Sequence, residues 1–189
     1  MDCQEAATPD PVDLLRDDEQ ASGLATLTLE IEAFEQRRGG SHFCLAARVD
    51  DQRVGFALLL RPSSRPGVPL PGHDLVLPRC EVQIASTGEE SDRFVAAVAA
   101  VYGIEAEAGR MLEELWFDAL CLAGDPDRPQ LGPVQLVLMY TGADARPRQG
   151  FQWFLRIDVT QGEAGFVDQA PEDHAAIVAA LSGSPAWRH

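Results

Sequence analysis

Two runs of carboxylates in the middle of this 189-residue chain are of types that could do chemistry. They are Glu89, Glu90 and Asp92, and Glu113 and Glu114. Carboxylates at this spacing can act as general acids or bases, or they can attract a cationic surface. We predict that these five side chains contact a partner. The alternative is that they are a solvated surface without a binding role.

The first acidic run also has a structural explanation. Ser86-x-x-Glu89 and Thr87-x-x-Glu90 both fit the capping box, in which a hydroxyl and a carboxylate bind free amides at a helix start. The stretch "RFVAAVAAVYG" continues with apolar residues at helical spacing and ends at Gly103, where a helix-terminating glycine belongs. The sequence therefore predicts a mostly buried helix whose first turn is acidic.

Two histidines stand next to carboxylates and could take part in proton transfer. His73 and Asp74 end a loop at 61–74 that is rich in proline, and His174 follows Asp173 at the start of a predicted C-terminal helix. Long ordered loops are often functional, so an enzyme of unrecognised family with a site near this loop is an alternative hypothesis. A solvated surface histidine is the simpler interpretation of each.

Several other chemistries lack the residues that they need. The chain has no lysine, so a standard P-loop and Schiff-base catalysis are excluded. No nucleophile elbow or dinucleotide fingerprint occurs. The cysteines lack the close spacing of a zinc site and are interpreted as free thiols: Cys3, Cys44, Cys80 and Cys121. We expect no metal, no cofactor and no catalytic residue.

The formal charge of −15 is clustered in two parts of the chain. Residues 1–20 contain seven acidic side chains and one arginine, and residues 88–127 contain ten and two. Such a field repels nucleic acid and accelerates association with a basic protein. The alternative is that the acidity only maintains solubility.

Periodicity predicts strands within 23–36, 42–49, 54–60, 75–86, 114–123, 134–141, 151–159 and 166–168. It predicts helices at 89–103 and from Pro171 to Gly183. Strands that are interrupted by single helices favour an α+β fold, with one or more antiparallel sheets and two main helices in the order strands, helix, strands, helix. Residues 1–20 form an acidic N-terminal segment, and 21–189 form a single α+β domain. No apolar stretch is long enough to cross a membrane, and the acidic N-terminus is unlike a signal peptide, so we expect a cytoplasmic protein.

Two stretches resemble a family. "GEESDRFVAAVAAVYG" is similar to a G-E-E-S-D-x-F-V…L-Y-G pattern, and "FLRIDVTQGEAGFVDQAPEDHAAIVAAL" resembles a strand, N-I-D, strand, E-K-D-P-E-Y-R, helix pattern. Both patterns occur in small uncharacterised bacterial proteins, some of the immunity type encoded near polymorphic toxins. The chain departs from the pattern at 168–174, which reads "DQAPEDH". The resemblance implies no catalytic residues.

These observations favour a non-enzymatic acidic binding protein, of the immunity type or chaperone-like, that engages a basic protein partner such as a toxin or effector. Nucleic-acid and membrane partners are not expected. A subunit of a larger assembly, joined through a sheet edge, is a further alternative. The sequence leaves the oligomeric state open.

Overall fold

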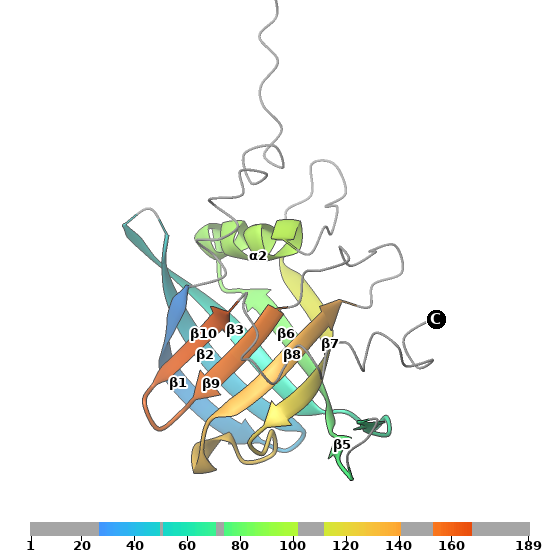
Figure 1. Cartoon of the computed structure of the whole chain (residues 1–189). Coiled ribbons are helices and arrows are strands. Elements are labelled where there is room, and N and C mark those ends of the chain that lie inside the picture. The colour runs from blue at the N-terminus through green and yellow to red at the C-terminus, as the bar shows by residue number, and fades with distance from the viewer. Residues whose placement is uncertain (1–26, 50, 71–73, 102–111, 141–152, 168–189) are drawn as a thin grey trace, which may run out of the picture.

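The computed structural model describes residues 27–49, 51–70, 74–101, 112–140 and 153–167, and it shows a barrel with a helix across one end (Figure 1). Eight strands form the barrel: β1 (Thr28–Arg37), β2 (Gly40–Val49), β3 (Gln52–Pro62), β6 (Arg79–Ser86), β7 (Glu114–Ala123), β8 (Val134–Tyr140), β9 (Trp153–Asp158) and β10 (Glu163–Val167). The helix is α2 (Glu89–Val101), and a small hairpin consists of β4 (Val68–Pro69) and β5 (Val76–Leu77).

The barrel is an up-and-down meander that is closed by its first and last strands. Each barrel strand pairs antiparallel with the barrel strands before and after it in the chain. Closure comes from β1 and β10, whose register pairs Thr28 with Gly165 and Glu30 with Glu163. The amide of Ile31 also donates a hydrogen bond of 2.7 Å to the carbonyl of Gly162.

The barrel interior is filled with apolar side chains because the strands alternate between inward and outward residues. The largest buried side chains of the strands are Leu29, Phe43, Leu45, Phe56, Leu58, Leu60, Ile84, Phe117 and Phe166. A barrel of eight strands is just wide enough for side chains to fill its interior. The hydrophobic core of the described residues therefore lies inside the barrel.

Helix α2 covers the end of the barrel at which β6 ends and β7 begins (Figure 1). Phe94, Val95 and Val98 are buried in the barrel core. The ring of Phe94 stacks on that of Phe56 with centroids 4.3 Å apart, and it lies 6.4 Å from that of Phe166. The helix thus completes the core at this end.

The start of α2 is capped differently from the predicted capping box. The hydroxyl of Ser91 accepts hydrogen bonds from the amides of Thr87 (2.7 Å) and Gly88 (2.9 Å). The Thr87 hydroxyl instead donates to the carbonyl of Gly55 in β3, at 2.6 Å. Ser91 therefore accepts hydrogen bonds from backbone amides at the helix start, the role that was predicted for Glu89 and Glu90. The Thr87 hydroxyl links the helix start to β3 of the barrel.

The proline-rich excursion between β3 and β6 packs on the outside of the barrel. Val68, Leu70 and Leu77 form a small apolar cluster with Leu120, which points outward from β7. Pro78 separates β5 from β6, where its missing amide hydrogen removes no hydrogen bond from either strand.

The predicted α+β fold class is wrong. The described residues are mostly β, with one closed antiparallel barrel and a single α-helix. Each segment that was expected to be a strand contains one, but β10 begins at Glu163, three residues before the predicted strand at 166–168. The three residues that the prediction left out, 163–165, are those that pair with β1. The predicted helix at 89–103 is observed from Glu89 to Val101, and the one at 171–183 lies outside the described residues.

Truncation of Phe94 tests the role of α2 in the core. We expect Phe94→Ala to lower the free energy of unfolding by about 3–5 kcal/mol, because it opens a cavity among Phe56 and Phe166. The neighbouring Arg93 is exposed, and Arg93→Ala should change stability by less than about 0.5 kcal/mol. Urea unfolding followed by circular dichroism measures both. Equal stability of the two variants would show that the helix is not part of the core.

Candidate partner-binding site

The backbone brings the two acidic runs to one end of the barrel. The amide of Ser86 donates a 2.8 Å hydrogen bond to the carbonyl of Glu113, and Ala85 pairs with Glu114 in the β6–β7 register. Helix α2 begins three residues after Ser86. We call Glu89, Glu90, Asp92, Glu113 and Glu114 the acidic rim.

The side chains of the acidic rim differ in solvent exposure and in hydrogen bonding. Glu89, Glu90, Glu113 and Glu114 are exposed, whereas Asp92 is half-buried with its Oδ1 covered. Glu114 accepts a hydrogen bond from the amide group of Gln83. Within the described residues, no ion pair involves a rim carboxylate. The rim therefore presents negative charge that no described arginine neutralises at close range.

Asp118 is a structurally important carboxylate that was not predicted from the sequence. It points outward from β7 and is only 6% exposed. Its Oδ2 accepts hydrogen bonds from Arg79 at 3.0 Å and from Arg65 at 3.3 Å. The sequence feature that could have indicated its importance is that it is the only acidic residue inside the otherwise apolar run "LWFDALCLA". Arg65 lies in the excursion, and Arg79 is the first residue of β6, directly after it. Their hydrogen bonds to Asp118 therefore hold the excursion against the outside of the barrel.

The alternative catalytic site at the proline-rich loop is only partly described. Asp74 is exposed and belongs to no described cluster, and His73 lies outside the described residues. His174 and Asp173 lie outside them as well. Of this alternative site, the structure describes Asp74 alone.

Asp158 stabilises the turn between β9 and β10. It accepts hydrogen bonds from the Thr160 hydroxyl (2.6 Å), the Gln161 amide (3.3 Å) and Arg156 (2.7 Å). The first of these bonds contributes most to a pKa of the Asp158 carboxyl below its ordinary value of 3.8, and Gln161 and Arg156 lower it further. The ion pair of Arg156 with Asp158 lies within one strand, β9. Asp158 is thus a turn residue.

The described thiols are free and differ in environment. Cys44 is exposed on the outside of β2, while Cys80 and Cys121 are buried in the barrel interior. Burial raises the pKa of Cys80 to about 12 and that of Cys121 to about 11. Because the thiolate is the reactive form, the two interior thiols should be inert at neutral pH.

No group of three or more metal-binding side chains occurs in the described part of the chain. None of its helices is long and apolar enough to span a membrane. Comparisons with protein-family models, with curated proteins and with solved structures gave no significant match.

The thiols provide a test of the barrel interior. In a Cys3→Ser background, which removes the cysteine outside the described residues, we expect one thiol to react rapidly with Ellman's reagent and two to react only on unfolding. The rapid reaction should disappear in a Cys3→Ser/Cys44→Ser variant. Rapid reaction of Cys80 or Cys121 in native buffer would contradict a packed interior.

The depressed pKa of Asp158 predicts how its contribution depends on pH. A carboxyl whose pKa is lowered by folding stabilises the protein above its unfolded pKa of about 3.9, and this stabilisation is lost as the pH falls through the folded pKa. Asp158→Asn should therefore be less stable than the wild type at pH 7, and the difference should shrink on acidification. Urea unfolding across this range measures it.

Replacement of the strongest hydrogen-bond donor provides the matching control. Thr160→Val removes the hydroxyl that lowers the pKa of Asp158 most, so its stability difference should also shrink with acid. A difference for Asp158→Asn that does not change with pH would show that the charge of this carboxyl contributes nothing.

Proposed function

We propose that this protein is a non-enzymatic binding protein, of the immunity type or chaperone-like, that engages a basic protein partner through the acidic rim. The observation that supports this function best is the convergence of two acidic runs, separated by twenty residues of sequence, at one end of the barrel. We further propose that it acts in the cytoplasm.

The charge environment of the rim supports recognition by charge. Some other acidic groups of the described residues have arginine partners, such as Glu35 with Arg37 (2.6 Å) and Glu32 with Arg53 (2.6 Å). The rim carboxylates form no such pair with a described residue, so they are available to a cationic partner. Attraction between complementary surfaces raises the association rate more than the final affinity.

The closed barrel suits a binding role more than self-assembly through strand edges. Seven of the eight barrel strands have described neighbours on both sides along most of their length, and closure removes the edges through which sheets usually associate. This argument favours recognition by side chains at the rim over the alternative of an edge-paired subunit.

Neutralisation of the rim tests this function. We compare a Glu89→Gln/Glu90→Gln/Glu113→Gln/Glu114→Gln variant with the wild type, by capture from a lysate of the host organism and then by surface plasmon resonance with the protein captured. The association rate of a basic partner should fall at least about ten-fold. The wild-type complex should form at about 20 mM salt and weaken strongly at about 500 mM, where charges are screened beyond about 4 Å.

A control with the same net charge separates the rim from overall acidity. It neutralises four exposed carboxylates elsewhere: Glu35→Gln, Asp51→Asn, Asp74→Asn and Asp127→Asn. The rim variant should lose association rate and the control should retain most of it. Equal losses in both would show that net charge alone attracts the partner, and no loss in either would contradict the proposed site.

A further inference from the structure

A row of apolar side chains crosses the outside of the barrel. Leu120 of β7 pairs with Val137 of β8, and Val137 pairs with Phe154 of β9. Their neighbours along the strands belong to the interior core: Ala119, Cys121, Leu136, Leu138 and Leu155. Because side chains alternate between the two faces of a strand, the three residues of the row point outward. We call Leu120, Val137 and Phe154 the outer apolar row.

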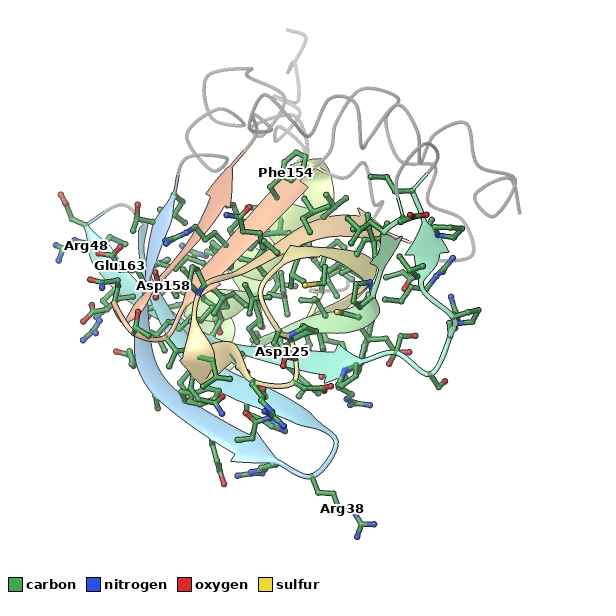
Figure 2. The ribbon with its side chains drawn as sticks, turned by 60° about the horizontal axis from the view of Figure 1, so that its bottom comes forward. Arg38, Arg48, Asp125, Phe154, Asp158 and Glu163 are labelled. Atoms are coloured by element: carbon green, nitrogen blue, oxygen red, sulfur yellow. The ribbon has the colours of Figure 1, made fainter. Side chains whose placement is uncertain are left out.

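The outer apolar row is buried although it lies on the outside. Leu120 is 0% exposed, Val137 1% and Phe154 6%. Figure 2 shows the ring of Phe154 on the outer side of β9, away from the barrel interior. Outward positions of an antiparallel sheet are usually polar and in contact with water, so a buried row here indicates a cover.

Two different covers lie over the row. The excursion between β3 and β6 covers Leu120, with which it forms the small apolar cluster. Among the described residues, Val137 and Phe154 belong neither to that cluster nor to the interior core. The next outward positions on their strands, Gln135 and Arg156, are polar and mark where the apolar surface ends. The cover over Val137 and Phe154 is therefore separate from the excursion.

The chain leaves the barrel directly beside this part of the row. Phe154 pairs with Val167, the last residue of β10. Residues 168–189 follow, and we call them the C-terminal segment. It starts about 4.8 Å, one strand spacing, from the backbone of Phe154.

The sequence of the C-terminal segment suits an apolar surface. The segment is predicted to form a helix from Pro171 to Gly183, in which Ile177, Val178 and Leu181 share one side. A helix of this length spans about 20 Å, and the strands from β10 to β7 span about 14 Å. The C-terminal segment can therefore extend over both Phe154 and Val137.

The other segments outside the described residues match the row less well. Residues 141–152 connect β8 to β9, but their one large apolar side chain, Phe151, stands among polar residues that include Arg146 and Arg148. Residues 1–26 lead into β1, which is separated from β9 by β10. Residues 102–111 lead into β7, which is separated from β9 by β8.

We propose that the C-terminal segment docks on the outer apolar row of its own chain. Its apolar positions 177, 178 and 181 then cover Val137 and Phe154. The folded domain accordingly includes this segment in addition to the barrel and α2. The inference does not depend on the proposed function, because it concerns a contact within the chain and leaves the acidic rim unchanged.

A thiol placed in the row tests this contact in the full-length chain. In the Cys3→Ser/Cys44→Ser background, Val137→Cys adds a thiol on the outside of the barrel wall, where the proposed cover shields it from Ellman's reagent. We expect it to react at least about ten-fold more slowly than the thiol of Cys44 does in Cys3→Ser, because reaction requires local opening of the cover. Addition of Leu181→Asp should displace the segment and make one thiol equivalent react rapidly.

Ala179→Asp is the matched control for Leu181→Asp. It adds the same charge, but helical spacing places position 179 on the side opposite 177, 178 and 181. The thiol at position 137 should therefore still react slowly. Cys80 and Cys121 report on the barrel, and they should stay unreactive in both variants because only the C-terminal segment is displaced.

Nuclear Overhauser effects make the test independent of how the variants fold. In the unsubstituted full-length chain with labelled methyl groups and phenylalanine rings, we expect contacts from Val137 and Phe154 to Ile177, Val178 or Leu181. If Leu181→Asp also makes Cys80 and Cys121 reactive, that variant has unfolded and these contacts decide.

Three results would overturn the inference. The first is rapid reaction of the thiol at position 137 without Leu181→Asp, which would mean that the row has no stable cover. The second is the same slow reaction with and without Leu181→Asp in a folded barrel, which would mean that another segment covers the row. The third is contacts from Val137 and Phe154 to residues 141–152 and none to residues 168–189.

Discussion

Pairing between β1 and β10 is the constraint on which the rest of the structure depends. The short ladder from Thr28–Gly165 to Glu30–Glu163 turns a meander of eight strands into a closed barrel. In a closed barrel, inward side chains pack against those of the opposite strands. An apolar interior therefore forms without a second sheet or a layer of helices. The interior then needs a cover only at its ends, and the stacked rings of Phe94 and Phe56 fasten α2 over one of them.

The barrel also decides where the charges lie. Because its interior is apolar, the ionisable side chains of the strands point outward, and the strand ends determine which of them meet. Asp118 and Asp158 are buried on the outside under arginine partners, and they fasten an excursion and a turn. The acidic rim is left without such partners among the described residues. The proposed function therefore depends on the meeting of two unpaired acidic runs at one end of the barrel.

The sequence predicts the elements well and their assembly poorly. The alternation in "LEIE" and "LRID" places β1 and β9 correctly, because the period of a strand is a local property. The bulge between Ile31 and Ala33 breaks this alternation and packs Phe34 against the core. Closure is a long-range pairing between the two ends of the described chain, and no local pattern encodes it. The five rim residues could be proposed from their types, but their convergence depends on the β6–β7 register. The role of Asp118 follows from arginines that are distant in sequence, and that of Ser91 from the backbone geometry at the helix start.

Barrel closure is best tested by nuclear Overhauser effects between β1 and β10 in the labelled full-length chain, combined with hydrogen exchange of the Ile31 amide. The structure predicts cross-strand contacts between Leu29 and Ala164, and slow exchange of the amide that binds the Gly162 carbonyl. Absence of these contacts together with rapid exchange at Ile31 would mean an open sheet with two free edges. That result would contradict the closed barrel, which is the central claim of this account.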